Sequence, residues 1–310
     1  MREKTKTKFK FNSRDIQLSV MASFSLVFLL IFSYLPMMGI ILAFKDGNKY
    51  LNIIMALGAD WTLDNFKMLF TDSEFWQVFF NTLHINLLML LINFPMPIIF
   101  ALLINEVRNR FVRTTIQTVS NFPHFISWVV YGGIVLALTD ANLGIVNPIL
   151  EFLGLSTKEN PIDLNLAQYF YPKLIIATII KGVGWGSIVY VAAIAGIDQS
   201  LYEAAMIDGA NRFQRAIHVT LPCIRSTILV FLLLNISRIM GNSFEQFYVF
   251  QTTANLSKTR VLATYMYTLG FTYRNYSTAT ALSLFEGIIS LILLVSVNFV
   301  AKKTTGEGIY

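Results

Sequence analysis

The sequence predicts an all-α integral membrane protein with six transmembrane helices and with both termini in the cytoplasm. Of its 310 residues, 55% are hydrophobic and only 14% are charged, which is too apolar a composition for a soluble domain of this size. Six apolar runs are long enough to cross a bilayer. These runs cover about residues 16–44, 77–104, 115–139, 170–196, 224–248 and 279–301.

The positions of the basic residues predict how these spans are oriented. Lys and Arg are retained in short cytoplasmic loops, so the more basic side of the chain is the inner side. With the N-terminus inside, more than half of the 24 basic residues fall on the cytoplasmic side. They are Arg2, Lys4, Lys6, Lys8, Lys10, Arg14, Arg108, Arg110, Arg113, Arg212, Arg215, Arg225, Lys302 and Lys303. Topology thus explains the net charge of +6, and no nucleic-acid partner is expected.

The first quarter of the chain divides into a basic cytoplasmic tail, residues 1–15, and a first span with its outer loop, residues 16–76. We expect the tail to lie beside anionic membrane lipid. The first apolar run is longer than the core of a cleavable signal peptide and lacks a small-residue cleavage site, so it should remain as a helix. In the outer loop, Thr62 to Phe66 has the pattern of a helix start near the membrane surface.

The other five spans form the core, residues 77–301, which a cytoplasmic loop at 197–223 interrupts and a cytoplasmic tail at 302–310 follows. Turn-forming residues divide the outer loop 140–169, leaving a short apolar helix at Ile149 to Leu153. Prolines should bend the second and third spans, because proline lacks the backbone N–H that a helix needs. They are Pro95, Pro97 and Pro123.

The cytoplasmic loop contains the most informative segment of the sequence. Glu203 to Asp208 is rich in alanine and predicts a short helix, which Gly209 can end because glycine adopts the left-handed conformation at little cost. A second short turn, Asn211 to His218, follows and runs into Leu221-Pro222. None of these side chains forms a catalytic pattern, so the segment is interpreted as a docking element.

The string EAAMIDGANRFQRAIHVTLP, residues 203–222, is similar to the EAA loop of ABC importer permeases. The resemblance implies that the loop is a coupling helix that docks on an ATPase carried by another chain. The glutamate would meet a basic residue of the ATPase, the two alanines would allow close packing, and the Asp-Gly pair would fix the turn. Ala216 departs from the family, which often has an aromatic residue there. The coupling residues so assigned are Glu203, Ala204, Ala205, Asp208, Gly209, Leu221 and Pro222.

Further segments resemble the oligosaccharide branch of these permeases, the maltose-type and polysaccharide importers. This resemblance implies a substrate that is an oligosaccharide or a polysaccharide fragment, and a place in a bacterial plasma membrane. It also implies the partners: a second homologous permease, two ATPase subunits and an extracellular solute-binding protein. The segments are Gly39–Lys45, Pro123–Val130, Phe244–Val249 and Thr278–Asn298.

The sequence lacks the motifs of an enzyme that would act by itself. It contains no phosphate-binding G-x-x-x-x-G-K-[ST] loop, no H-E-x-x-H and no G-x-S-x-G. Its three histidines, His84, His124 and His218, are scattered, so neither a metal site nor a bound cofactor is expected. ATP and Mg²⁺ would be bound by the partner ATPase alone.

A polar face in the fifth apolar run predicts part of a substrate pathway. Charged side chains inside a membrane usually face a partner or a water-filled cavity. At roughly 100° per residue, five polar residues of this run fall within an arc of about 100° on one helix face. They are Asn235, Arg238, Asn242, Glu245 and Gln246. Amides and charges there would bind sugar hydroxyl groups, and aromatic planes would contact the apolar face of a sugar ring.

Two other spans carry polar groups that could join this pathway. Lys181 and Trp185 lie one turn apart on the fourth span, and the sixth span carries Glu286. The glutamate belongs to a cluster formed by Thr280, Ser283, Glu286, Gly287 and Ser290. These groups could instead pair within the bundle, for example Glu286 with Arg238 or Lys181, and serve only to hold helices together.

Three alternative functions stay open at this point. An ABC permease for a non-sugar solute would have the same coupling loop. An ATP-independent channel or carrier would show repeats or broken helices around a midplane site and would leave the loop unexplained. An intramembrane enzyme is disfavoured because no nucleophile and base pair, and no metal-ligand cluster, is recognisable.

Overall fold

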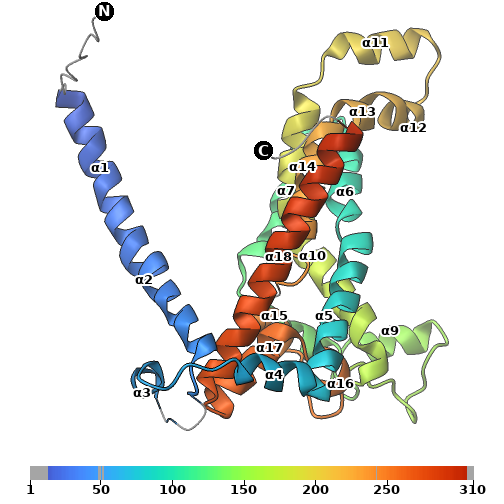
Figure 1. Cartoon of the computed structure of the whole chain (residues 1–310). Coiled ribbons are helices and arrows are strands. Elements are labelled where there is room, and N and C mark those ends of the chain that lie inside the picture. Colours follow the sequence, from blue (N-terminus) through green and yellow to red (C-terminus); the bar gives the residue numbers. More distant parts are fainter. Residues whose placement is uncertain (1–12, 48–49, 51, 242, 306–310) are drawn as a thin grey trace, which may run out of the picture.

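The computed structural model describes residues 13–47, 50, 52–241 and 243–305, and its regular elements in this part are all helices (Figure 1). Long helices run beside one another through the middle of the molecule, and shorter helices gather at its two ends. Four helical segments are long and apolar enough to cross a membrane, or up to six if each of two bent pairs counts as one span.

The first apolar run forms one helical rod that stands apart from the other helices over most of its length (Figure 1). It comprises α1 (Ser13–Leu29), a π turn (Leu30–Tyr34), α2 (Leu35–Met37) and a 3₁₀ segment (Met38–Phe44). Most side chains of this rod are exposed, and only the 3₁₀ segment packs on the last helix, α18 (Tyr276–Thr305). Its apolar surface therefore faces lipid or another chain.

Two short helices precede the second span at the end of the molecule opposite α11 (Figure 1). They are α3 (Ile53–Leu57) and α4 (Asp64–Thr71), the second of which confirms the helix start predicted around Thr62. The Thr62 hydroxyl accepts a hydrogen bond from the backbone N–H of Asp64 at 3.0 Å. Such a side-chain oxygen satisfies an N–H group that the first turn of a helix leaves free.

The second span consists of α5 (Ser73–Ile92) and α6 (Pro95–Asn105), which together form one candidate span. The third span has the bend that Pro123 predicts, but the bend is so sharp that residues 115–139 form two separate helices. Here α7 (Arg110–Asn121) and its 3₁₀ extension (Phe122–Phe125) meet α8 (Trp128–Leu138) at 103°.

The physical reason for this break is local. Pro123 supplies no backbone N–H to continue the helix, and Ser127 starts a new one by accepting a hydrogen bond on its hydroxyl from the Val130 N–H at 3.3 Å.

A long fourth span forms the centre of the bundle. After α9 (Val146–Phe152), close to the predicted short helix, the chain enters a 3₁₀ turn (Ala167–Tyr169) and then α10 (Phe170–Ala195). Helix α10 contacts α6, α7 and the Phe122–Phe125 turn. Its buried face continues into clusters of buried apolar side chains shared with α5, α6, α8 and α14.

The loop at 197–223, which was predicted to be cytoplasmic, and the fifth span differ in part from their predictions. The loop forms α11 (Gln199–Ile207), α12 (Arg212–Arg215), a π turn (Ala216–Thr220) and α13 (Leu221–Cys223), and at Ile224 it bends by 67° into the next helix. That helix, α14 (Arg225–Ser237), ends eleven residues before the predicted limit of 248. At about 1.5 Å per residue it is roughly 20 Å long, shorter than the hydrocarbon core of a bilayer.

The chain between the fifth and sixth spans folds back as short helices. These are α15 (Phe244–Tyr248), α16 (Leu256–Thr259), α17 (Leu262–Tyr267) and a π turn (Thr268–Thr272), followed by α18. Helix α17 packs on α5, where the Tyr265 hydroxyl donates to Asp72 at 2.6 Å and Arg260 pairs with Glu74. Burial, together with the Asp72 carboxylate, raises the pKa of Tyr265 above its ordinary value, so this hydroxyl stays protonated.

Candidate functional site

The predicted coupling helix is present as α11, at one end of the molecule (Figure 1). Its first turn is capped by Asp198, whose Oδ1 accepts from the Ser200 N–H at 2.9 Å, and this backbone hydrogen bond lowers the pKa of the carboxyl group. Gly209 has a φ of +81°, as the glycine stop requires. The Ala210 N–H then bonds the Ala205 carbonyl at 2.9 Å, which satisfies a carbonyl at the helix C-terminus.

The second turn of the loop is fixed by its own side chains and by one contact to the neighbouring loop. Asn211 and Gln214 form a reciprocal capping box, with hydrogen bonds of 2.8 and 2.9 Å. Arg212 lies 3.7 Å from Glu106, which follows α6, and so connects the coupling loop to the turn between the second and third spans. The loop is thus preformed within this chain.

The exposed surface of this loop carries charged and apolar side chains. Glu203 and Asp208 are exposed, and neither makes a side-chain hydrogen bond or ion pair within the described residues. In the same loop, Ile207 of α11 is 85% exposed and Phe213 of α12 is 73% exposed. Sequence reasoning missed these two apolar residues, although apolar residues in a predicted cytoplasmic turn are a readable signal of a docking face.

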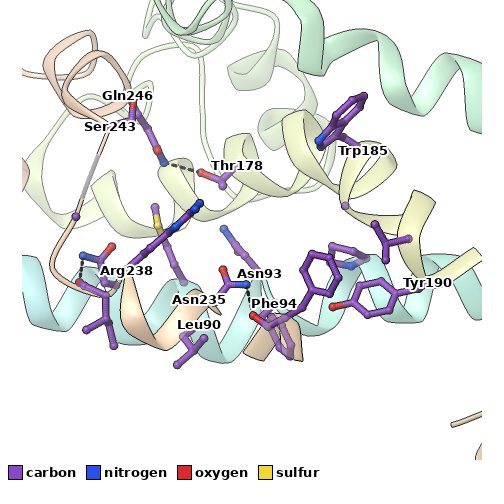
Figure 2. Close-up of a pocket in the computed structure, with 18 residues that line it drawn as sticks. Leu90, Asn93, Phe94, Thr178, Trp185, Tyr190, Asn235, Arg238, Ser243 and Gln246 are labelled. Carbon is purple, nitrogen blue, oxygen red and sulfur yellow. Dashed lines mark hydrogen bonds between the residues drawn. The ribbon is translucent and has the colours of Figure 1, made fainter. Parts of the chain in front are cut away.

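A second candidate site is a cavity of about 430 Å³ between α5 and α6 on one side and α10, α14 and α15 on the others (Figure 2). Its walls combine amide, hydroxyl and guanidinium groups with aromatic rings. The polar lining residues are Asn86, Asn93, Thr178, Asn235, Arg238, Ser243 and Gln246. The aromatic lining residues are Phe94, Trp185, Tyr190 and Phe231.

Some of the polar groups in this cavity are already hydrogen-bonded within the chain. The amide nitrogen of Gln246 donates to the Thr178 hydroxyl at 3.2 Å, that of Asn235 to the Phe231 carbonyl at 2.8 Å, and that of Asn86 to the Ile239 carbonyl at 2.6 Å. Figure 2 shows the first two bonds, one on each side of the cavity. These contacts fix the orientation of the three amides.

Several polar side chains of the cavity, Arg238 and Asn93 among them, have no partner among the described residues. The guanidinium of Arg238 makes no hydrogen bond or ion pair there, and its side chain extends into the cavity (Figure 2). Both polar atoms of the Asn93 amide are buried without a hydrogen bond. An unpartnered buried amide costs roughly 1–3 kcal/mol, so this pair of residues is suited to receiving a polar ligand.

The structure brings together only part of the predicted pathway set. Trp185, Asn235, Arg238 and Gln246 line the cavity, but they come from α10, α14, the turn after α14, and α15. The prediction of one helical polar face is therefore wrong, because α14 ends at Ser237 before the stripe is complete.

The remaining predicted pathway residues lie elsewhere. Glu245 is exposed and does not line the cavity, and Asn242 lies outside the described residues. Lys181 is buried beside the break in the third span, where it donates to backbone carbonyls. The alternative pairing of Glu286 with Arg238 or Lys181 does not occur in the described part of the chain.

Sequence reasoning also missed the other polar residues of the cavity: Asn86 and Asn93 on the second span, Thr178 on the fourth, and Ser243 just before α15. A signal was available in the second span, because two amides seven residues apart in an apolar run share one helix face. The polar cluster of the sixth span lines a separate groove of about 1070 Å³ beside the first span and α17. That cluster consists of Thr280, Ser283, Glu286, Gly287 and Ser290.

Comparison with known proteins shows the family of the chain. Residues 93–304 match the family described as the binding-protein-dependent transport system inner membrane component. The chain belongs to this family. It is thus a multi-pass inner-membrane permease subunit of an ABC importer, and the ATPase of such a transporter is a separate subunit.

Two relatives from Bacillus subtilis (strain 168) match along almost the whole chain. Protein LplB is 40% identical over 298 residues, which cover 96% of this chain and 92% of LplB. The polygalacturonan/rhamnogalacturonan transport system permease protein YteP is 39% identical over 285 residues, covering 92% of this chain and 87% of YteP.

A solved structure shares the fold. It is a chain of a bacterial ABC transporter involved in the import of the acidic polysaccharide alginate, with a TM-score of 0.84 and 35% sequence identity. The match covers 94% of this chain and 97% of that chain. The alginate transporter has also been solved in complex with a periplasmic protein that holds an alginate pentasaccharide, and the corresponding TM-score is 0.85.

Proposed function

We propose that this permease imports an acidic oligosaccharide, a fragment of a polysaccharide delivered by an extracellular binding protein, and that the cavity between α5, α10 and α14 is part of its path. The observation that carries the proposal is Arg238, a guanidinium without a partner among the described residues in a cavity whose other lining groups include amides, hydroxyls and aromatic rings. A guanidinium binds a carboxylate through two parallel hydrogen bonds, which suits a uronic acid.

The rest of the lining fits the other parts of a sugar. Asn93 offers a donor and an acceptor that have no partner among the described residues, matching a hydroxyl group that both donates and accepts. The Trp185 indole lines the wall and offers an apolar plane for the face of a sugar ring. The transport of polygalacturonan, rhamnogalacturonan and alginate by similar proteins supports a uronic-acid substrate.

The membrane topology that goes with this function has six spans and two cytoplasmic termini. The two bent helix pairs then count as one span each, which brings the number to six. The start of α1 and the end of α18 lie toward the end of the molecule that carries α11 (Figure 1). With α11 in the cytoplasm, α3, α4 and α9 lie on the outer side, where a binding protein would deliver its sugar.

Energy would enter through the exposed face of α11. A docked ATPase would place a basic residue against Glu203, take up Ala204 and Ala205 in a close contact, and cover Ile207. Asp208 and Gly209 hold the turn that keeps this face in position, and Leu221-Pro222 passes the motion to α14. ATP and Mg²⁺ would be bound by two ATPase copies, and a second homologous permease would complete the pathway.

The test is import by the complete transporter in liposomes. This chain, its companion permease, the ATPase and the binding protein are reconstituted together, and short labelled oligogalacturonides are compared with neutral maltooligosaccharides and with a tripeptide. We expect uptake of the oligogalacturonides with ATP and none with a non-hydrolysable ATP analogue. Uptake of the tripeptide alone would overturn the sugar assignment, and uptake without ATP would overturn the importer assignment.

A further inference from the structure

At the break in the third span, one residue of another helix supplies the hydrogen-bond donors for the backbone carbonyls. Between the Phe122–Phe125 turn and α8 the chain bends by 103°. A bend of this kind leaves backbone carbonyls without partners at membrane depth, where each unsatisfied group costs several kcal/mol. Three carbonyls lie at the end of the first arm of the bend, those of Pro123, His124 and Ile126, and that of Pro123 accepts a backbone hydrogen bond from the Ile126 N–H at 3.3 Å.

Lys181 of α10 donates to all three of these carbonyls. Its Nζ lies 2.9 Å from the Pro123 oxygen and 3.2 Å from the His124 oxygen, and it also bonds the Ile126 oxygen. The ammonium has three N–H donors and no acceptor, so three carbonyls saturate it. The residue is only 6% exposed, and no carboxylate lies within ion-pair distance among the described residues.

The same ammonium also contacts the second arm of the bend. It lies 5.2 Å from the ring centroid of Trp128 and 5.3 Å from that of Tyr131, both in the first turn of α8. Tyr131 forms a second link between α8 and α10, because its hydroxyl donates to the Ala177 carbonyl of α10 at 2.8 Å. One cation therefore joins both arms, through hydrogen bonds on one side and cation–π contacts on the other.

The bend is connected to the cavity through a stacked pair of rings. His124, whose carbonyl Lys181 holds, lies with its imidazole parallel to the Trp185 indole at 4.4 Å between centroids and 2° between planes. Trp185 in turn lines the cavity, whereas Lys181 does not. Displacement of the His124 backbone would therefore move the ring that supports the indole.

We propose that Lys181 is a positioning residue: it locks the bend of the third span and, through His124, holds the Trp185 indole in the cavity wall. The lysine does not contact the substrate. This inference concerns the architecture of the bend, and only its consequence for import rests on the proposed function.

The test measures the bend and the transport separately. Hydrogen exchange of the complete transporter is followed for the amides of residues 122–131, with α11 as an internal reference. Lys181→Met removes the donors at similar length, and Lys181→Arg keeps a cation with N–H donors. We expect exchange in 122–131 to rise at least about tenfold in Lys181→Met and to be largely restored in Lys181→Arg, with α11 unchanged.

Transport kinetics then show whether the substitution changes substrate binding or the rate of import. Lys181→Met should raise KM for imported oligogalacturonides more than it lowers kcat, because the cavity wall is displaced while coupling is intact. His124→Leu removes the ring stack but keeps the backbone carbonyls, so it should raise KM with little change in exchange. If Lys181→Met is not recovered folded, Lys181→Gln, which keeps an amide donor, is measured in the same way.

Two results would overturn the inference. A raised KM in Lys181→Met with unchanged exchange would show that the ammonium contacts the substrate instead. Unchanged exchange together with unchanged KM would show that the bend does not need the lysine. If wild type imports no sugar, the exchange measurement still decides whether Lys181 locks the bend, so failure of the proposed function is recognised separately.

Discussion

The coupling loop and the cavity are both polar sites in an apolar chain, but they are built in opposite ways. The loop is made from one continuous segment, residues 198–220, and its backbone turns are closed by neighbours within five residues. The cavity is assembled from α5, α6, α10, α14 and α15, whose contributions are separated by up to 160 positions in the chain. Contacts between near neighbours in the chain suffice to form the loop, whereas the formation of the cavity depends on where helices break and cross.

The two sites also differ in what they leave unsatisfied. The loop keeps its charged and apolar groups on an exposed face, where Glu203 costs nothing until a partner covers it. In the cavity, the Asn93 amide is buried without a partner, and this lowers the stability of the folded chain until a ligand or water binds. An exposed docking surface can therefore bind its partner tightly without lowering the stability of the unbound chain. A polar cavity inside a membrane lowers that stability as long as it is empty.

The largest effect is expected from the loop. Glu203→Ala should abolish co-purification of the ATPase and reduce ATP-driven uptake at least about a hundredfold, because leaving the partner's basic residue buried and unpaired costs several kcal/mol. Pull-down and uptake measure this change. Glu159→Ala, an exposed acid in the loop before α10, is the matched control and should behave as wild type. Retention of the ATPase by Glu203→Ala would contradict the assignment of α11.

The next largest effect is a loss of stability that tests how closely α10 and α7 cross. A methyl group added at Gly184 would lie 2.3 Å from the Ser120 backbone oxygen, whereas one added at Gly182 meets nothing within 4 Å. Gly184→Ala should therefore destabilise the protein by roughly 1–3 kcal/mol and Gly182→Ala should not. Thermal unfolding in detergent checks both variants. Equal stability of the two would mean that α10 and α7 do not cross this closely.

The next prediction is a smaller change in stability, with opposite signs for substitutions of Asn93 and Asn86. Asn93→Leu removes a buried amide without a partner and should stabilise the chain by about 1 kcal/mol while lowering import. Asn86→Leu removes the donor to the Ile239 carbonyl and should destabilise it by about 1–3 kcal/mol. Stability and import are measured on both variants. A loss of stability in Asn93→Leu would show that this amide is satisfied in the assembled transporter.

The smallest effect concerns the contact between loops. Arg212 and Glu106 form a partly exposed ion pair, which is worth at most about 1 kcal/mol and is screened by salt. Arg212→Ala should therefore lower ATP-driven uptake only slightly, and the difference from wild type should shrink as the salt concentration rises. A loss as large as that of Glu203→Ala would mean that Arg212 itself contacts the ATPase.

The contrast between the sites also explains what could be predicted from the sequence. The turn at Gly209, the helix before it and the family followed from one contiguous string. The apolar runs indicated the membrane spans but not their interruptions, because a proline such as Pro123 is compatible with both a kink and a complete break. Lys181 was expected in the pathway because a charged side chain inside a membrane usually faces a partner or a water-filled cavity, but its partners are backbone carbonyls beside that break.

The central claim is that energy enters at α11 and the sugar passes at Arg238, and one paired measurement tests it directly. ATPase binding and import of labelled oligogalacturonides are recorded for Arg238→Met and Glu203→Ala in the complete transporter. We predict that Arg238→Met retains the ATPase but imports these acids poorly, and that Glu203→Ala loses both. If Arg238→Met imports the acidic sugar as well as wild type does, or if the two variants lose the ATPase equally, the assignment of separate sites is contradicted.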